Sequence, residues 1–516
     1  MTDLVYQTIK TGVKFYTELS WLQEVYDRAE AVCAVNRVDF AGREGLIEGS
    51  YYRHLWLETQ PMAGEMYARR DAEVGLNNQL FFIERQAENG RLPGMISRQP
   101  VEGLPGMVTE PDGLTAYYGW LQGFCLALPA YLLSYTIGRD PDYLQRLYDC
   151  LKRFDDYLWT YRDSDGDGCL ESWCVWDTGE DNCSRFFEGS PEAWPGEKPP
   201  IGLGRLPYES MDFMGYSCQC RETLALLSRD LGNGEEVYWR QQTCRLRQKI
   251  RSYLWDEEKQ ACYDRDCDNR RLDTLLHNNL RVMYSGGMEP DMADGFVQRH
   301  LLNPEEFWTK LPLPSIARND PMYRNSNDNN WSGPPQGLTY QRAVQALMRY
   351  GYHRETVRLG RIWLEVCRQT GVFAQQYDPE TWEPSVNSRD YGPSALAALE
   401  YISLLYGILP KGDRLIWSCA DGKTRCITEQ RWGDAVYRLE TGGGMQAYRN
   451  DEPLFTCSAG VRVVTDFDGG SPVLIGIEKE PVRVLFTSPS GTIDVLLPPN
   501  GRYPADSGEP LGVRLW

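Results

Sequence analysis

The segment from Tyr161 to Phe187 gathers side chains that could carry out acid–base chemistry on a polar ring. It reads YRDSDGDGCLESWCVWDTGEDNCSRFF and is dense in carboxylates, amides and aromatic rings. Cleavage of a glycosidic bond needs a carboxylic acid that protonates the leaving oxygen, and aromatic and amide groups that hold the sugar. Asp181 is one such carboxyl, but a single Asp in a Gly- and Asn-rich turn more often caps a loop or helix. The role of Asp181 therefore has to be inferred from the residues that flank it.

Other catalytic chemistries find less support in the sequence. The chain has four histidines, none at metal-ligand spacing, which argues against zinc hydrolysis and against a Ser/His/Asp triad. The closest cysteines, Cys218 and Cys220, have no second pair nearby that would complete a zinc site, and core packing explains them. We expect no metal and no organic cofactor, so acids and amides must carry the chemistry.

The stretch from Asp163 to Glu171, DSDGDGCLE, resembles the start of a calcium loop. Oxygen-bearing side chains alternate and a glycine stands at the sixth position, but Cys174 occupies the twelfth position, where a bidentate Glu is needed. An ordinary Asp/Gly turn is the favoured interpretation, and a calcium site of another type is the alternative.

The segment WDTGEDNCSRF, from Trp176 to Phe186, resembles the Gly-x-Asp-Asn-Ser-x-Arg segment of six-hairpin glycosidases. These include family 63, with processing α-glucosidases and mannosylglycerate hydrolase, and more distantly the trehalases. The resemblance implies that Asp181 is the general acid. Four further segments are similar to barrel hairpins and catalytic loops of the same superfamily, and they occur in the same order: residues 66–96, 254–266, 311–352 and 371–402.

The chain departs from the family pattern at the second catalytic position. Where the family has the Glu that activates water, this chain has Gln375 in QQYDP, and a glutamine cannot accept a proton. Inversion needs a second carboxylate roughly 6.5 to 9.5 Å from the acid. We expect Glu58 or Asp378 to serve, ahead of Glu180, Glu380 and Glu383, and Gln375 to bind the water or a hydroxyl. Ser332 replaces a family Arg, which indicates an altered sugar subsite.

Several residues of these segments are candidates for binding the sugar. Arg185 could face the substrate or orient the acid, with an ordinary salt bridge as the alternative. The aromatic candidates could equally be core residues, because 16 tryptophans give the chain many rings to bury. The predicted substrate-binding residues are Trp56, Gln60, Asp71, Trp176, Asn182, Arg185, Trp331, Gln336 and Tyr377.

The elements that must position these residues are mainly helical. Apolar residues recur at three- and four-residue spacing over residues 114–137, 142–161, 211–231, 235–254, 338–350 and 354–369. Consecutive amphipathic helices joined by alternating short turns and long loops suit a closed ring of helical hairpins with the long loops at one end. The predicted fold is therefore mainly α, an (α/α)6 barrel over residues 51–408.

After Pro410 the pattern changes to short strand-like runs separated by Gly, Asp and Pro turns. This predicts a C-terminal antiparallel β-sandwich over residues 409–516. Residues 1–50 are predicted to form a helical lead-in. Neither an export signal nor a membrane span is expected, and the 15 cysteines are interpreted as reduced thiols, which favours a cytoplasmic location.

The net charge of −19 argues against nucleic-acid and anionic membrane partners. The expected function is hydrolysis of a small α-linked saccharide or glycoside with inversion. Because the family base is missing, a lyase, epimerase or phosphorylase on the same barrel is one alternative, and a saccharide sensor without turnover is another. The sequence specifies no oligomeric state.

Overall fold

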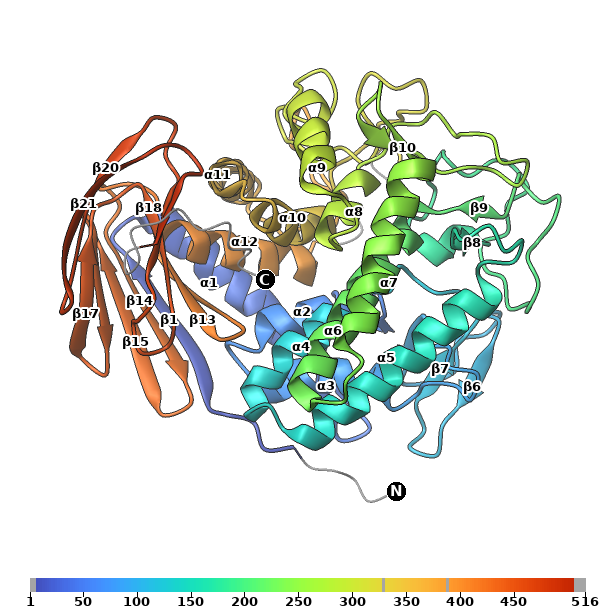
Figure 1. Cartoon of the computed structure of the whole chain (residues 1–516), viewed down its shortest axis with the longest axis horizontal. Helices are drawn as coiled ribbons and strands as arrows, with labels where there is room; N and C mark the ends of the chain where they lie inside the picture. Colours follow the sequence, from blue (N-terminus) through green and yellow to red (C-terminus); the bar gives the residue numbers. More distant parts are fainter. Residues whose placement is uncertain (1–5, 327–329, 387–388, 505–516) are drawn as a thin grey trace.

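A computed structural model describes residues 6–326, 330–386 and 389–504. Six helices form a closed ring, because each contacts the next and the last returns to the first. Figure 1 shows this ring with further helices around it. The ring helices are α2 (Gln60–Tyr67), α4 (Ala127–Leu133), α6 (Met211–Leu231), α8 (Asn278–Tyr284), α10 (Gly337–Arg349) and α12 (Gly392–Tyr406).

Other helices pack around this ring. Those that contact ring helices from outside are α1 (Ser20–Val35), α3 (Ala72–Ile83), α5 (Pro141–Tyr161), α7 (Glu236–Lys249) and α11 (His353–Thr370). α9 (Pro290–Phe296) follows α8, and π-helical turns extend α7 over Ile250–Leu254 and α9 over Val297–Leu301. None of the described helices combines the length and apolarity needed to cross a membrane.

Capping residues mark the ends of the longer helices. Asp140 accepts hydrogen bonds from the backbone N–H groups of Asp142 and Tyr143, and Pro141 occupies the first position of α5. Ser210 caps α6 in the same way, and Gly232 ends it in the left-handed conformation. The predicted helices over 142–161, 211–231, 338–350 and 354–369 are confirmed to within a residue at each end.

The prediction of a continuous helix over residues 114–137 is wrong. Residues Thr115–Tyr117 form strand β7, which pairs with β5 (Met95–Ser97), and α4 begins only at Ala127. Gln122 and Gly123 both have positive φ, a conformation that a helix does not allow. The apolar residues before α4 have helical spacing, but they are buried side chains of a strand and a loop.

Short strands brace the loops at the ends of the helices. β7 lies in a four-stranded sheet, order β4-β5-β7-β6, with β4 (Leu55–Trp56) and β6 (Met107–Thr109). Three pairs stand alone: β2 (Arg37–Phe40) with β3 (Arg43–Leu46), β8 (Glu171–Ser172) with β9 (Tyr208–Glu209), and β10 (Trp255–Asp256) with β11 (Ala261–Cys262). A 3-10 turn η1 (Ser134–Ile137) extends α4.

Two antiparallel sheets form the C-terminal part of the chain, as expected. The seven-stranded sheet has the order β1-β14-β15-β16-β17-β20-β21 and the five-stranded sheet the order β12-β13-β18-β19-β22. Side chains from both sheets form one buried hydrophobic cluster, which includes Trp417, Leu439 and Phe455. The strands are β12 (Ile408–Lys411), β13 (Arg414–Cys419), β14 (Cys426–Trp432), β15 (Ala435–Thr441), β16 (Met445–Arg449), β17 (Glu452–Cys457), β18 (Val461–Thr465), β19 (Val473–Gly476), β20 (Val482–Ser488), β21 (Gly491–Leu497) and β22 (Arg502–Pro504).

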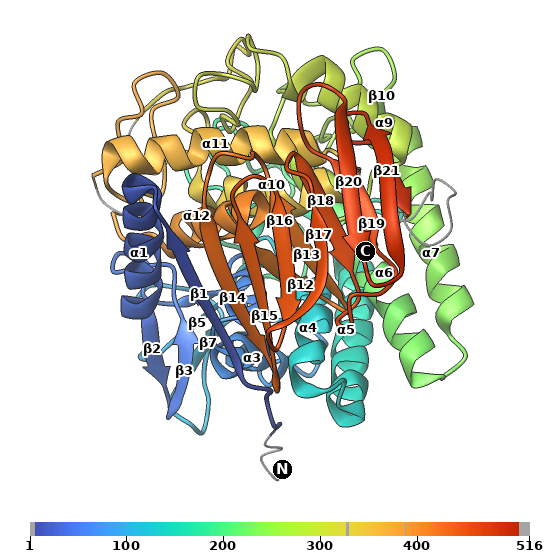
Figure 2. The same ribbon diagram turned by 90° about the vertical axis from the view of Figure 1, so that its left-hand side faces the viewer.

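The N-terminal segment contributes to both parts of the molecule. The predicted helical lead-in contains α1, which packs on α12, but strand β1 (Thr11–Thr17) precedes it and completes the edge of the seven-stranded sheet. β1 pairs with β14 along its whole length, from Thr11 opposite Trp432 to Thr17 opposite Cys426. Figure 2 shows β1 beside β14, with α1 next to it. Residues far apart in sequence therefore share one sheet.

Candidate active site

A cavity of about 520 Å³ opens among the loops at one end of the ring. Segments from distant parts of the chain supply its walls, among them β4, the loop after β7, the loop around Asp181 and the loop before α12. The lining residues include several large aromatic rings and five acids: Glu48, Glu58, Asp181, Glu188 and Glu192. They include Glu48, Tyr52, Trp56, Glu58, Trp120, Gln122, Trp176, Asp181, Asn182, Phe186, Phe187, Trp331, Gln375 and Tyr391.

Asp181 lies on the cavity wall directly after the turn η2 (Val175–Thr178). Gly179 ends that turn in the left-handed conformation, with φ 72°. The backbone carbonyl of Asp181 accepts a hydrogen bond from Trp331 N at 3.3 Å, and Arg281 donates to the carbonyl of Thr178 at 2.8 Å. The backbone on both sides of this carboxyl is therefore fixed by residues of other loops and helices.

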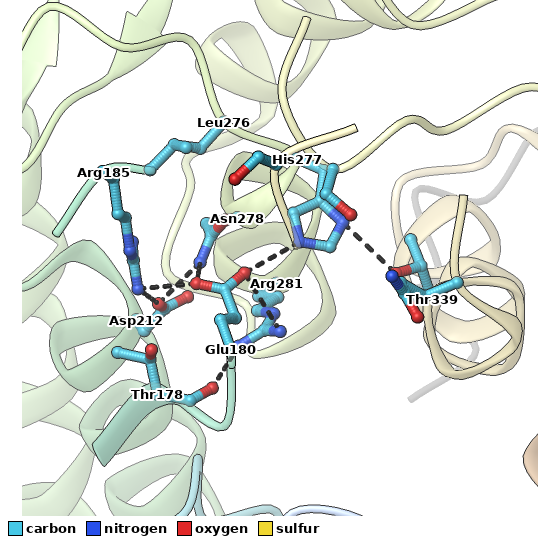
Figure 3. A network of polar contacts seen from close by, with 12 residues as sticks. Thr178, Glu180, Arg185, Asp212, Leu276, His277, Asn278, Arg281 and Thr339 are labelled. Atoms are coloured by element: carbon cyan, nitrogen blue, oxygen red, sulfur yellow. Dashed lines mark hydrogen bonds and ion pairs between the residues drawn. The ribbon is translucent and has the colours of Figure 1, made fainter. Parts of the chain in front are cut away.

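Glu180, the neighbour of Asp181, is a buried anchor. Its carboxylate lies 2.7 Å from Arg185 and 3.3 Å from Arg281, and accepts from Asn278 at 3.1 Å. His277 lies 2.9 Å away on the opposite side, as Figure 3 shows. Burial alone would raise the pKa of Glu180, but the two arginines and His277 lower this pKa well below its ordinary value. The partners of Glu180 therefore favour its ionised form, and Glu180 is not among the residues that line the cavity.

Arg185 has three buried carboxylates as partners. Besides Glu180 it contacts Asp212 at 3.1 Å and Asp264 at 3.0 Å, and its side chain is almost fully buried. Figure 3 shows it pointing into this cluster together with Asp212. Arg185 therefore does not line the cavity; it forms the salt bridges that were the alternative interpretation, and they anchor the segment next to Asp181.

Glu58 is a cavity acid with charged partners. Its Oε1 lies 2.8 Å from Arg342 and 3.6 Å from Arg281. Burial raises the pKa of Glu58, and the two arginines offset part of that rise. A Cβ on Gly179 would lie only 2.1 Å from Glu58 Oε2, so this carboxylate packs directly against the loop of Asp181. Glu58 thus belongs to the same wall as the acid.

Glu48 is a cavity carboxyl that the sequence analysis missed. It lies with Tyr52, Tyr391 and Gln375 on the cavity wall and is 7% exposed. Its Oε1 accepts a hydrogen bond from Thr59 Oγ1. Burial, together with the negative charges of Glu58 and Asp181, raises the pKa of Glu48 to about 8. No motif marks Glu48, which falls in the segment predicted to be a lead-in, so only its burial beside Gln375 identifies it.

The structure brings several of the predicted binding residues to the cavity. Trp56, Trp176, Asn182 and Trp331 line it, as does Gln375, whose Oε1 accepts a hydrogen bond from Tyr52 at 3.0 Å. Trp120, Phe186 and Phe187 also line it and were not predicted. Trp120 and Trp176 meet edge to face, with ring centroids 5.1 Å apart, so the cavity has an aromatic side.

Other predicted residues lie outside the cavity lining. Asp71 caps α3 by accepting from the N–H groups of Glu73 and Val74, and pairs with Arg37 at 3.0 Å. Tyr377 is fully buried and packs edge to face on Trp363, with centroids 5.4 Å apart. Both side chains therefore have structural roles outside the cavity lining.

Three more predicted residues form hydrogen bonds within loops and do not line the cavity: Gln60, Gln336 and Asp378. Gln60 accepts a hydrogen bond from the backbone N–H of Trp56 at 2.5 Å, and Gln336 donates to the carbonyl of Asn330 at 3.1 Å. Asp378 accepts from the N–H groups of Glu380 and Thr381 in a turn and from Asn325 at 2.7 Å. Glu380 and Glu383 are exposed on the same turn. None of these three acids lines the cavity in the described part of the chain.

The Asp/Gly turn after α5 brings acids together away from the cavity. Asp163, Asp165 and Asp167 have carboxylate oxygens within 4.8 Å of one another, and so do Asp165, Glu171 and Glu209. Asp163 accepts from the N–H of Gly168, as in an ordinary turn. The loop therefore combines the hydrogen bonding of an Asp/Gly turn with groups of acids that could hold a metal ion.

The comparisons with known proteins converge on one group. The model of the mannosylglycerate hydrolase MGH1-like glycoside hydrolase domain matches residues 65–394. A cytosolic neutral trehalase from Emericella nidulans is 26% identical over 162 residues, which cover 29% of this chain and 21% of the trehalase. The chain therefore spans about a fifth of the length of that relative.

Two solved structures share the fold. A family 63 mannosylglycerate hydrolase from Thermus thermophilus, in complex with Tris and D-glycerate, aligns with a TM-score of 0.59 at 18% identity, covering 73% of this chain and 99% of that one. A neutral trehalase from Saccharomyces cerevisiae aligns with a TM-score of 0.54 at 14% identity, covering 73% of this chain and 80% of that one. At these identities the likeness concerns the fold.

Proposed function

This chain belongs to the family of mannosylglycerate hydrolase MGH1-like glycoside hydrolase domains, and from that premise we propose that it hydrolyses a small α-linked saccharide or glycoside with inversion. The resemblance to six-hairpin glycosidases is confirmed, and the protein is a glycosidase. The ring of six inner helices supports its assignment as an (α/α)6 barrel. The observation that carries the proposal is the cavity that holds Asp181 among aromatic side chains.

Asp181 is the proton donor in this proposal. Its carboxyl is half-buried on the cavity wall, and its backbone is fixed by Trp331 and by the anchored Glu180. A fixed acid can protonate the glycosidic oxygen while the bond to the anomeric carbon breaks. The rigid support matters because a displacement of about 1 Å can cost about 100-fold in rate.

The aromatic side of the cavity and Glu58 would hold the sugar. Trp56, Trp176 and Trp331 present rings on which a sugar face can stack. Glu58 is kept in place by Arg342 at 2.8 Å, so its carboxylate can accept hydrogen bonds from sugar hydroxyls. A cavity of about 520 Å³ fits a small saccharide and not a long polymer segment.

We also propose that the protein is located in the reducing environment of the cytoplasm. All 15 cysteines are free, and 13 of them are buried, which is typical of proteins kept reduced. The cytosolic trehalase relative supports the same location. Phosphorolysis has no support from the cavity, since its lining within the described residues contains no Arg, Lys or His to bind phosphate.

The test is product formation by wild type and Asp181→Asn on a panel of α- and β-linked disaccharides and aryl glycosides. We expect wild type to release a monosaccharide whose first-formed anomer, followed by NMR, is inverted. Asp181→Asn should lose about 100- to 10,000-fold with poor leaving groups and keep its saccharide affinity. Near-normal turnover by this variant would contradict the role of Asp181, and binding without product by wild type would indicate a sensor.

A further inference from the structure

The position of the family base is occupied by a residue that cannot act as one. Gln375 lines the cavity, and its amide oxygen accepts a hydrogen bond from Tyr52 at 3.0 Å. Hydrolysis with inversion still requires a group that removes a proton from the attacking water on the face of the sugar opposite the acid. A second carboxyl on the wall of Gln375 would meet that requirement.

Backbone hydrogen bonds hold Glu48 near the segment that carries Gln375. Gly392 N donates to the carbonyl of Glu48 at 2.5 Å, and Tyr391 N donates to the carbonyl of Phe373 at 2.8 Å. The segment around Tyr391 therefore lies between Glu48 and the strand-like stretch that leads to Gln375. Glycine suits this close approach, because a Cβ at position 392 would lie in tight contact, 3.1 Å, with the Glu48 carbonyl oxygen.

The surroundings of the Glu48 carboxyl suit a base better than those of the other buried acids. Glu58 and Glu180 each pair with arginines, whereas Glu48 forms no ion pair with Arg or Lys within the described ranges. Its partners are the hydroxyls of Thr59 and Tyr391. A carboxylate held by neutral donors keeps more of its basicity than one neutralised by a guanidinium.

The alternatives are placed less well. Glu58 packs against Gly179, two residues before Asp181, and so lies on the acid's own side of the cavity. Asp378 is bound in a turn outside the cavity lining. Glu188 and Glu192 also line the cavity, but both are exposed to solvent. Glu48 itself falls outside residues 65–394, so the family match assigns it no role.

We propose that Glu48 is the catalytic base that replaces the missing family glutamate at Gln375. This inference rests on the proposed glycosidase function. Water attacks the anomeric carbon while the glycosidic C–O bond breaks; the bond's electron pair goes to the leaving oxygen, which takes the proton of Asp181. Glu48 takes one proton of the water, and the product is the free sugar of inverted configuration. Exchange with solvent then returns the proton from Glu48 to Asp181.

Chemical rescue distinguishes a base from a structural residue. Glu48→Gln should lower hydrolysis by about 100- to 10,000-fold, because the amide cannot accept a proton. Sodium azide should restore turnover of an activated aryl glycoside by this variant and yield a glycosyl azide of inverted configuration, because azide needs no deprotonation. Asp181→Asn, Glu58→Gln and Asp378→Asn serve as comparisons, and Glu88→Gln, on the exposed surface, is the control that should match wild type.

A second variant tests whether the base can be moved. Adding Gln375→Glu to Glu48→Gln should recover part of the lost hydrolysis, because it restores a carboxylate at the family position. If Glu48→Gln does not fold, Glu48→Asp, which keeps the carboxyl but shortens it, takes its place and should also respond to azide.

The outcomes separate the two proposals. Wild-type activity with an impaired Asp181→Asn and a normal Glu48→Gln would overturn the role of Glu48 and leave the glycosidase intact. Azide rescue of Glu58→Gln or Asp378→Asn instead would assign the base to that residue. Inactive wild type on every substrate would overturn the proposed function itself.

Discussion

At the scale of single residues, the proposed role of Glu48 as the base depends on whether its carboxyl is ionised. Burial, with the charges of Glu58 and Asp181, raises the pKa of Glu48 to about 8, and the hydroxyls of Thr59 and Tyr391 oppose this rise. Glu48 is therefore largely protonated below about pH 8, and it can accept a proton from water only above that pH.

The pH profile of kcat/KM should accordingly rise as the pH increases through about 8, where Glu48 loses its proton and becomes able to act as the base. Measurement from about pH 5 to about pH 10 with a neutral substrate tests this. The azide-dependent reaction of Glu48→Gln should lack the acidic limb, because no base is needed. A wild-type profile that is flat through pH 8 would contradict the role of Glu48 as the base.

At the scale of the element, the turn η2 sets the position of the acid. Gly179 ends it with φ 72° and leaves no space for a side chain, since a Cβ would lie 2.1 Å from Glu58 Oε2. Gly179→Ala should therefore cost about 1–2 kcal/mol for the left-handed conformation and about 1–3 kcal/mol for overpacking. Gly232→Ala is the matched control, because Gly232 has φ 63° at the end of α6 with nothing within 4 Å of its Cβ position.

Urea unfolding and kcat measured on both variants check this expectation. Gly232→Ala should lose only the conformational part and keep kcat, whereas Gly179→Ala should also lose kcat by about 10- to 100-fold because Asp181 shifts. Equal losses of stability in the two variants, with kcat unchanged, would show that the contact with Glu58 does not hold the loop.

At the scale of the whole molecule, buried polar contacts join the helices to the β domain. Arg462 of β18 donates to the carbonyl of Leu404 in α12 at 3.1 Å and lies 2.9 Å from His353 at the start of α11. Burial lowers the pKa of Arg462 to about 9 and holds the pKa of His353 well below its ordinary value. From the helical side, Arg69 donates to the carbonyl of Ile408 in β12 at 2.7 Å.

These contacts predict that the helical body and the β domain unfold together. Arg462→Ala leaves the Leu404 carbonyl and Ser418 without their donor and should lower the free energy of unfolding by about 1–3 kcal/mol for each unsatisfied group. Calorimetry should show one transition in wild type and a lower, still single, transition in the variant. Two separate transitions in wild type would show that the interface does not couple the two parts.

The sequence by itself determined what depends on local chemistry. Asp140 with Pro141, Ser210 and Gly232 define the helix ends, because capping needs only neighbouring residues. The mainly helical fold with a C-terminal antiparallel part and the family membership also followed from patterns along the chain. The prediction of Asp181 as the acid came from the motif around it and stays a prediction that the cavity supports.

Only the tertiary structure decided what depends on contacts between distant residues. No motif marks Glu48. It becomes a candidate only because its carbonyl accepts a hydrogen bond from Gly392 N and its side chain lines the same cavity as Gln375, more than 300 residues away in the sequence. Strand β1 joins a sheet whose other strands lie at the far end of the chain. Arg185 and Asp71 looked like ligands of a sugar, but three buried carboxylates surround one and a helix end holds the other. A side chain's partners follow from packing, and packing joins segments whose sequence separation leaves no local signal.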